Sequence, residues 1–414
     1  MNSQSYEICV FGLGFVGLTT ALSFAEKNYK VAGIDINQNL LNELKNGSVP
    51  FNEPYLQNKL KKNLNKKNLS LNNKIKFSKK KKYIIFICVG TPVDNQSEYN
   101  LTSIKKVINY INLNANSNCY LYLKSTVLPG TTEMIKKKLI KNKKIEICSN
   151  PEFLREGKAW LDFNNADKIV VGYDNKIFLK ISKIIYKNFK GELLLVNPGT
   201  AEFIKQTSNA MLSNMISFSN NLALLAEKFK KIDIKKTFEA IHLDKRFFGY
   251  PAQISSYIYP GLGFGGYCLP KDIQALSNFS KKYKQDYFFK NIIKVNNDIF
   301  QHHLKKILSK TNKKSKIFIL GLSFKEGTDD IRQSKTINLT DELLKRNYKD
   351  IILCDKLATE ELKELYINSK AIKVFVKPFY KKNSIYIIGS TDKYYLNFLK
   401  KIPNKQIIDT KYSQ

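Results

Sequence analysis

Arginine is scarce in this 414-residue chain, although lysine and arginine together number 69 and the formal net charge is +34. The four arginines are Arg155, Arg246, Arg332 and Arg346. Lysines occur in short runs along the whole length, without a compact basic tail or finger motif, which favours a solvated surface over a nucleic-acid site. A positive field also collects small anions. An arginine retained among so many lysines suggests a need for the planar, forked guanidinium.

Paired cysteines and long apolar runs are lacking too. The chain has six cysteines but no C-x-x-C pair, which argues against disulfides and a zinc site and fits a reducing cytoplasm. No stretch approaches the ~20 apolar residues of a membrane span, and the first residues lack the basic region of a secretion signal. We therefore expect a cytoplasmic protein without metal, membrane or nucleic acid. Five cysteines lie in or beside apolar, β-rich runs typical of buried positions: Cys9, Cys88, Cys119, Cys148 and Cys354.

A dinucleotide fingerprint occupies the first forty residues. A strand predicted at Tyr6–Phe11 leads into Gly12-Leu-Gly-Phe-Val-Gly17 and a helix, and the strand Val31–Ile36 carries Asp35. Gly12 allows the tight turn, Gly14 lets a pyrophosphate approach, and Gly17 lets helix and strand pack. Phe15 and Val16 complete the motif. Asp35 is placed to accept both ribose hydroxyls and to repel a 2′-phosphate, so the pattern predicts NAD rather than NADP.

Strand-like runs continue to about residue 198 and resume after residue 316, with helical patterns between them. The fold class is therefore α/β, with two Rossmann-like doubly wound domains joined by a long central helix and a small helical domain. The helix is expected at about 200–230, and the stretch 273–309 also looks helical. The expected domains are 1–198 for NAD, 199–310 for the central helical and dimerisation part, and 311–414 for the nucleotide sugar.

Several strand ends carry polar residues. Ligands of such sheets bind beyond the carboxyl ends of the strands, so Thr91 and Thr126 are candidates for the cofactor cleft. The alternative is that these threonines cap helices, which is the expectation for Thr131 and Thr132. Glu152 and Glu156 would share one face of a helical turn, either organising water or cofactor or forming an exposed acidic turn.

Lys205 and Asn209, in the long helix, are spaced so that both point at one ligand. The alternative is a solvated lysine beside a neutral amide.

The stretch Gly261-Leu-Gly-Phe-Gly-Gly-Tyr-Cys-Leu-Pro-Lys-Asp272 is predicted to carry the chemistry. Its four glycines let the backbone lie close to a bulky group. Cys268 follows at once, and a helix starting near Pro270 would bring Lys271 and Asp272 close to the thiol. A nucleophile, a cation and a base are thus placed beside an anion-friendly loop.

Taken in order, these motifs resemble the UDP-glucose/GDP-mannose dehydrogenase family over nearly the entire chain. The resemblance rests on Gly12 to Gly17, Gly90-Thr-Pro92, Ser125-Thr126 with Pro129-Gly-Thr-Thr132, Asn150-Pro-Glu-Phe-Leu-Arg-Glu-Gly157, Lys205 with Asn209, Gly265-Gly-Tyr-Cys-Leu-Pro-Lys-Asp272, and Phe324-Lys325 with Asp329-Asp330 and Arg332.

The resemblance implies oxidation of a nucleotide sugar at its carbon-6 hydroxyl to a carboxylate, with two NAD and one water. It implies a covalent role for Cys268, through a thiohemiacetal and a thioester. Lys205 and Asn209 match residues that stabilise the oxyanion. Asp272 matches the residue that handles protons and water, assisted by Thr126 and Glu152.

The resemblance also assigns binding residues and a homodimer. The implied cofactor contacts beyond the fingerprint are Thr91, Thr126, Glu156, Lys271 and Arg332. The implied substrate contacts are Glu152, Phe153, Leu154, Lys205, Asn209, Phe264, Gly265, Lys325 and Arg246, the last reaching across a dimer.

Three departures from the family pattern concern the substrate. Asn221 stands where many relatives carry Glu, and Asp409-Thr-Lys411 stands where relatives often show Asp-Gly-Arg. The spacer from Arg246 to Gly261 is rich in tyrosine and is expected to reshape the sugar pocket. UDP-glucose is the favoured substrate, GDP-mannose the second, and a UDP-N-acetylhexosamine a further alternative. A one-step 6-phosphogluconate-type dehydrogenase is a weaker candidate, since it needs neither Cys268 nor a second nucleotide domain.

Overall fold

A computed structural model describes residues 6–94, 98–227, 229, 231–244, 259–282, 284 and 286–413. The chain forms two compact units, 1–208 and 209–414, and each is described by itself. Arg246 lies outside the described residues, and so does most of the spacer that follows it.

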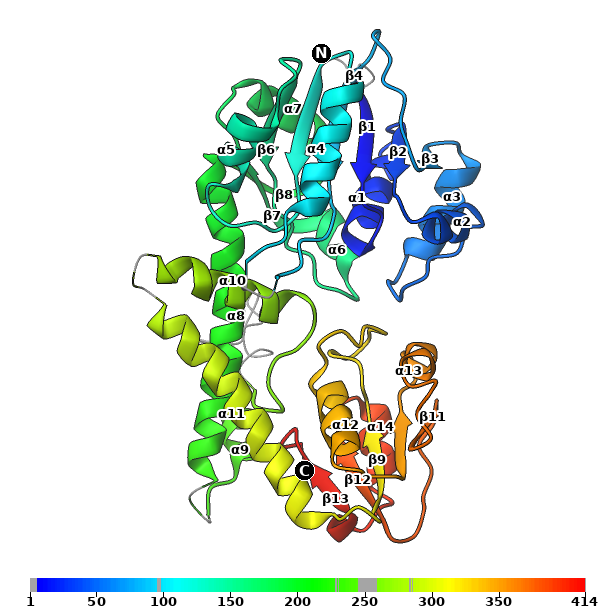
Figure 1. Cartoon of the computed structure of the whole chain (residues 1–414), viewed down its shortest axis with the longest axis vertical. Helices are drawn as coiled ribbons and strands as arrows, with labels where there is room; N and C mark the ends of the chain where they lie inside the picture. Colours follow the sequence, from blue (N-terminus) through cyan, green and yellow to red (C-terminus); the bar gives the residue numbers. More distant parts are fainter. Residues whose placement is uncertain are drawn as a thin grey trace. The chain divides into compact units, whose positions relative to one another are not determined.

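The first unit is built on an eight-stranded sheet of order β3-β2-β1-β4-β5-β6-β7-β8 (Figure 1). Neighbouring strands are parallel, whereas β6 and β7 pair antiparallel through Ser149 and Gly172. The strands are β1 (Tyr6–Phe11), β2 (Val31–Ile34), β3 (Leu69–Asn72), β4 (Lys82–Ile87), β5 (Cys119–Leu123), β6 (Ile145–Ser149), β7 (Asn165–Gly172) and β8 (Lys190–Val196).

Both faces of this sheet are covered by helices. Successive side chains of a strand point to opposite faces, so Ile8 and Val10 of β1 join one core while Cys9 and Phe11 join the other. The first core includes apolar residues of α1 and α7, and the second those of α4. The helices are α1 (Phe15–Glu26), α2 (Gln38–Lys45), α3 (Leu56–Asn65), α4 (Thr102–Asn114), α5 (Thr131–Met134) with η2 (Ile135–Leu139), α6 (Ala159–Asn164) and α7 (Ile177–Ile185).

The predicted long helix is α8 (Pro198–Ala226), 29 residues without a break. Pro198 fits its first position, where the missing N–H costs nothing. It is followed by α9 (Ile234–Leu243).

The stretch 273–309, predicted to be helical, is occupied by two helices, α10 (Cys268–Lys281) and α11 (Tyr287–Lys310). Lys284 between them has a φ of +57°, which no helix accommodates.

The second sheet has five parallel strands in the order β11-β10-β9-β12-β13 (Figure 1). Residues of α11 and α12 pack on one face, and residues of α14 on the other, so the predicted second Rossmann-like domain is confirmed. The elements are β9 (Lys316–Leu320), α12 (Lys335–Lys345), β10 (Ile351–Cys354), α13 (Thr359–Leu365), β11 (Ile372–Phe375), β12 (Ser384–Ile388), α14 (Lys393–Leu399), η4 (Asn404–Gln406) and β13 (Ile407–Asp409).

In the described parts of the chain, every helix is too short or too polar to cross a membrane. The same residues contain no His, Cys, Asp and Glu cluster able to hold a metal ion.

Candidate functional site

The three glycines of the fingerprint have three different environments. Gly12 has a φ of +87°, in the left-handed region that glycine adopts readily. A Cβ on Gly17 would overlap the carbonyl of Gly12, so the helix can approach the turn only without a side chain. A Cβ on Gly14, in contrast, would meet nothing within 4 Å. This open space lies where the glycine fingerprint predicts the approach of a pyrophosphate.

Asp35 follows β2 and binds the backbone of the same turn. One of its carboxylate oxygens accepts the N–H of Leu13 at 2.7 Å, and the other accepts that of Asn37 at 2.8 Å. The side chain is only partly buried. Because each carboxylate oxygen has two lone pairs, lone pairs are left over for ribose hydroxyls. The glycine turn and Asp35 therefore fit NAD.

The threonines at the strand ends differ in their roles. Thr91 is buried and donates its hydroxyl to the carbonyl of Thr126 at 2.8 Å, so it ties two strand ends together. The prediction that Thr131 and Thr132 cap a helix is wrong. Both lie inside α5, and Thr132 donates its N–H and its hydroxyl to the carboxylate of Glu202 at 2.7 Å and 2.6 Å.

Sequence reasoning overlooked Glu202, whose only signal is an acid in an apolar part of the long helix. Burial raises the pKa of this carboxyl group, and the hydrogen bonds from Thr132 and Gly130 oppose that effect.

The segment carrying Glu152 and Glu156 is not helical, so the idea of one shared helical face is wrong. Glu152 is buried and forms an ion pair with Lys205, with an Nζ–Oε1 distance of 2.9 Å. The other oxygen of Glu152 accepts the N–H of Leu154 at 2.6 Å. The Lys205 ammonium also lies 5.4 Å from the ring centre of Phe153. Glu152 and Lys205 are therefore paired inside the first unit.

Lys124 is a second buried cation in this region that the predictions missed. Its ammonium donates to the side chain of Asn150 at 3.3 Å. Burial lowers the pKa of Lys124, while the negative charge of Glu152 acts in the opposite direction. A lysine at the end of an apolar strand was the available signal, because such a cation rarely stays buried without a role.

The glycine loop of the second unit is held by two buried asparagines. The N–H of Gly261 donates to the side chain of Asn220 in α8 at 2.8 Å. Asn296 of α11 binds both backbone groups of Phe264, accepting its N–H at 2.7 Å and donating to its carbonyl at 3.1 Å. Neither asparagine was predicted. An amide in an apolar helix stripe is their only sequence signal.

The same loop packs closely on the segment that follows β9. A Cβ on Gly265 would come within 2.6 Å of the carbonyl of Gln333, and one on Gly266 within 2.5 Å of the Phe324 ring. Only glycine permits these approaches. Lys325, a predicted substrate contact, lies on this segment and is partly buried.

Cys268 is the first residue of α10 and is partly exposed. Pro270 sits in the first turn of that helix, where backbone N–H groups lack intrahelical partners. Lys271 and Asp272 form a buried ion pair, and Asp272 also accepts a hydrogen bond from Asn209. The dipole of a 14-residue helix favours a negative charge at Cys268.

The predicted site residues thus form two groups. Thr126, Glu152 and Lys205 are associated with the first unit, and Asn209, Asp272 and Cys268 with the second. Lys205 and Asn209 lie one helical turn apart in the unbroken α8.

Lys411, the departure near the C-terminus, packs its side chain against Gly261 at the start of the loop. Burial lowers the pKa of this lysine, and Glu326 and Asp409 oppose the shift.

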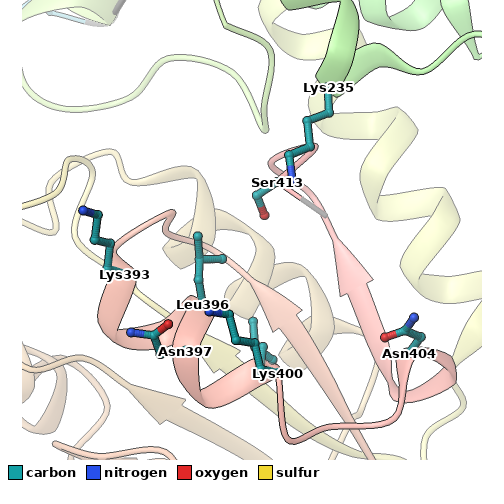
Figure 2. Close-up of a pocket in the computed structure, with 8 residues that line it drawn as sticks. Lys235, Lys393, Leu396, Asn397, Lys400, Asn404 and Ser413 are labelled. Atoms are coloured by element: carbon teal, nitrogen blue, oxygen red, sulfur yellow. The ribbon is translucent and has the colours of Figure 1, made fainter. Parts of the chain in front are cut away.

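A cavity of about 550 Å³ lies elsewhere in the second unit (Figure 2). It contains none of the predicted site residues, so it does not coincide with the predicted chemistry. Its lining residues are Lys235, Lys393, Leu396, Asn397, Leu399, Lys400, Asn404 and Ser413.

Comparisons with known proteins identify the family. Three of its domain models match this chain in order. The NAD binding domain of the UDP-glucose/GDP-mannose dehydrogenase family matches residues 6–190, the central domain 199–298, and the UDP binding domain 318–413.

Individual proteins agree with that match. The UDP-glucose 6-dehydrogenase TuaD of Bacillus subtilis is 33% identical over 80% of this chain and 72% of its own length. A UDP-glucose dehydrogenase structure from Pyrobaculum islandicum superposes with a TM-score of 0.86 at 27% identity, covering 100% of this chain and 96% of that one. A GDP-mannose dehydrogenase from Pseudomonas aeruginosa gives 0.54 at 26% identity, covering 98% and 96%.

The matched NAD binding domain contains the glycine turn and Asp35, and the matched UDP binding domain contains the second sheet. The chain belongs to the UDP-glucose/GDP-mannose dehydrogenase family and is an NAD-dependent nucleotide-sugar dehydrogenase.

Proposed function

We propose that this enzyme oxidises the carbon-6 hydroxyl of UDP-glucose to a carboxylate, consuming two NAD and one water and yielding UDP-glucuronate. The observation that carries the proposal is the position of Cys268. It begins α10 in the same turn as the buried Lys271–Asp272 pair, directly after a loop packed on the second sheet's domain. A thiol there is suited to trap an aldehyde.

The cysteine divides a four-electron oxidation into two hydride transfers. NAD, when bound, accepts one hydride in each. After the first, the alcohol has become an aldehyde, and the Cys268 thiolate adds to its carbon to give a thiohemiacetal. Loss of the second hydride leaves a thioester on Cys268. Water then attacks the thioester carbon, releasing the acid and regenerating the thiol.

The other proposed catalytic residues manage charge and protons. Lys205 and Asn209 stabilise the oxyanion that forms when the thiolate or water adds. Asp272 moves protons to and from water, because its carboxylate sits at the junction of Lys271 and Asn209. Thr126 and Glu152 assist. The ion pair between Glu152 and Lys205 supports this, since it keeps the buried lysine charged and oriented.

The remaining predicted residues are proposed to bind. Lys325 and Arg246 hold the nucleotide, with Arg246 supplied by a second copy of the chain. Phe153, Leu154, Phe264 and Gly265 line the sugar. The additional cofactor contacts are Thr91, Thr126, Glu156, Lys271 and Arg332. The three domains 1–198, 199–310 and 311–414 belong to the same proposal.

A homodimer is proposed from the surface of α8. Three large apolar side chains on this helix are exposed, Phe203, Met211 and Phe218. Their spacing of eight and seven residues places them along one face. A stripe of this kind suits burial against another copy of the same helix.

GDP-mannose is the second candidate substrate, and a UDP-N-acetylhexosamine the third. Lys411, which packs on Gly261, and the spacer between Arg246 and Gly261 in the sequence are two of this chain's departures from the family pattern. A one-step 6-phosphogluconate-type oxidation is the weakest candidate, because it would leave Cys268 without a task.

Two measurements test the proposal. NADH formation with a panel of UDP-glucose, GDP-mannose and UDP-N-acetylhexosamines should be fastest with UDP-glucose and should reach two NADH per sugar. One NADH per sugar at completion would exclude the four-electron reaction. Cys268→Ser should stall turnover, and wild-type turnover in that variant would exclude the covalent role.

A further inference from the structure

The aromatic ring before the proposed nucleophile is contacted by two cations. The guanidinium carbon of Arg332 lies 4.8 Å from the ring centre of Tyr267, and the ammonium nitrogen of Lys271 lies 5.2 Å from it. Both distances are within the range of a cation–π interaction. Burial raises the pKa of the Tyr267 phenol, so the ring stays neutral near pH 7. Tyr267 therefore interacts through the π face of its ring and does not act as a base.

The side chain of Arg332 is itself oriented by hydrogen bonds to Asp330. Its Nε donates to both oxygens of Asp330 at 3.0 Å and 2.9 Å, and its Nη2 donates to one of them at 2.5 Å. The backbone N–H of Arg332 donates to the same carboxylate at 2.8 Å. A guanidinium fixed in this way presents its flat face in one direction.

Lys271, the second cation that contacts the ring, is itself bound to a neighbouring residue. It is 4% exposed and pairs with Asp272, which is 1% exposed and accepts a hydrogen bond from Asn209. Consecutive contacts thus run from Asp330 through Arg332, Tyr267, Lys271 and Asp272 to Asn209. Cys268 is joined covalently to the middle of this series.

We propose that Tyr267 is a positioning residue, whose ring is oriented by Arg332 and in turn fixes Lys271 and, through it, the Asp272 carboxylate beside Cys268. This inference rests on the proposed roles of Cys268 and Asp272. A buried ammonium keeps its charge only where its surroundings stabilise it. Without the ring, Lys271 loses one of its partners, and the carboxylate that it orients loses its fixed position.

The proposal separates the ring from the hydroxyl. A cation–π interaction needs the aromatic face, which phenylalanine retains and leucine lacks. In the full-length enzyme, we expect Tyr267→Leu to lower kcat about tenfold while the KM for the nucleotide sugar changes less than about twofold. Tyr267→Phe should restore kcat to within about threefold of wild type. Tyr287→Leu, which removes an exposed tyrosine of α11, is the matched control and should leave both constants unchanged.

Coupling to Arg332 is tested with a double variant. Arg332→Gln should cost more in the wild-type background than in the Tyr267→Leu background, because part of its effect passes through the ring. Arg346→Gln, which removes an arginine paired with Glu342 on α12, should add the same small effect to both. Additive losses for Arg332→Gln and Tyr267→Leu would contradict the proposal, and so would a Tyr267→Phe enzyme as impaired as Tyr267→Leu.

A measurement without turnover keeps this inference separate from the proposed function. The rate of alkylation by iodoacetamide at Cys268 is followed by peptide mass spectrometry, with a cysteine-free peptide of the same digest as the internal reference. We expect the rate to change about threefold or more in Tyr267→Leu and to stay near wild type in Tyr267→Phe. If Tyr267→Leu does not fold, Arg332→Gln takes its place and should shift the same rate. Unchanged alkylation with unchanged kcat would overturn the role of Tyr267. Full turnover by Cys268→Ser would instead overturn the proposed function.

Discussion

The first strand of each sheet, β1 or β9, leads into a glycine turn of the same geometry. Gly12 after β1 has a φ of +87°, and Gly321 after β9 has a φ of +81°. Each glycine donates its N–H to the end of the neighbouring strand, to Ile34 in one sheet and to Cys354 in the other, at 2.9 Å in both. Asp35 and Asp355 then follow those neighbouring strands. The local geometry of a dinucleotide turn is therefore present twice.

The segments that follow the two glycine turns differ. α1 begins at Phe15, so its first amide groups lie next to the open space over Gly14, an arrangement suited to an anionic ligand. α12 begins only at Lys335, and the intervening residues approach the glycine loop through Phe324 and Gln333. The longer connection at the second turn therefore provides a contact surface for the glycine loop. The residues after the first glycine therefore decide what such a turn binds.

The two aspartates differ accordingly. Asp355 is 3% exposed and accepts four backbone N–H groups, from Leu322, Ser323, Leu357 and Ala358, at 2.7 to 3.2 Å. Asp35 is partly exposed and accepts two. All four lone pairs of the Asp355 carboxylate therefore accept backbone N–H groups, whereas the Asp35 carboxylate keeps lone pairs that could accept ribose hydroxyls.

The largest effect on stability is expected at Gly17 and Gly389, two glycines that have the same steric constraint in the two sheets. A Cβ on Gly17 would overlap the Gly12 carbonyl, and one on Gly389 would overlap the Gly321 carbonyl. Either glycine-to-alanine change should destabilise the protein by about 3 kcal/mol, because packed backbone must shift. Only Gly17→Ala should also abolish NAD binding. Urea unfolding and NAD titration measure the two effects. Loss of NAD affinity in Gly389→Ala would show that the second turn also contributes to the cofactor site.

Asp355→Asn should be the next most damaging change. The amide NH₂ would face N–H donors and leave buried groups unpaired, at a cost of about 3 kcal/mol, while NAD affinity stays at the wild-type value. Asp35→Asn should cost about 1 kcal/mol of stability and weaken NAD about tenfold. A larger loss of NAD affinity in Asp355→Asn than in Asp35→Asn would contradict the different roles of the two aspartates.

Mild acid should affect the second unit more than the first. All three histidines lie in the second unit. His303 of α11 is fully buried, and among the described residues neither of its ring nitrogens has a hydrogen-bond partner. Burial lowers the pKa of His303 from 6.5 to about 3, with Lys306, His302 and Lys411 adding to the shift and Glu227 opposing it.

The sign of the pH effect follows from where the proton binds. Below pH 6.5 the unfolded chain protonates this histidine while the folded protein does not, so stability falls as pH decreases towards 3. The loss is up to about 1.4 kcal/mol per pH unit over this window. Between pH 6.5 and pH 5, the urea midpoint measured by circular dichroism should fall more than the midpoint measured by the fluorescence of Trp160. Trp160 is the single tryptophan and lies in the first unit. His303→Leu should remove the difference, and His242→Gln should not.

The smallest effect on stability is expected at Gly14. A Cβ there meets nothing within 4 Å, so Gly14→Ala should change the free energy of unfolding by less than about 0.5 kcal/mol. Its methyl group would occupy the approach of the pyrophosphate, and NAD affinity should fall about tenfold. Isothermal titration with NAD measures this. Wild-type affinity would place the pyrophosphate elsewhere.

Much of the fold could be predicted from local patterns. The strand Tyr6–Phe11 has the predicted bounds, and the long helix lies within four residues of its predicted ends. The strands Leu69–Asn72 and Ile372–Phe375 were missed. Both are short edge strands with alternating or weak apolar patterns, so they depend on pairing with a neighbour more than on their own composition.

The candidate site was predictable only in part. Cys268, Asp35 and the glycines stand in recognisable spacings. Asn220, Asn296 and Glu202 were missed because each acts on a backbone group that is remote in sequence. The prediction that Glu152 and Glu156 share one helical face was wrong for a similar reason. Glu152 pairs with Lys205, which is more than fifty positions away in the sequence.

The sequence by itself determined the α/β class, the dinucleotide turn, the long helix and the candidate nucleophile, because these depend on periodicity and on glycine at fixed spacing. Only the tertiary structure decided which of two similar turns has open space beside its glycine and which is followed by a segment that packs on the cysteine loop. That decision depends on side chains such as Phe324, Arg332 and Asp355, whose partners are brought near by folding. Burial and long-range pairing, not local composition, give these residues their roles.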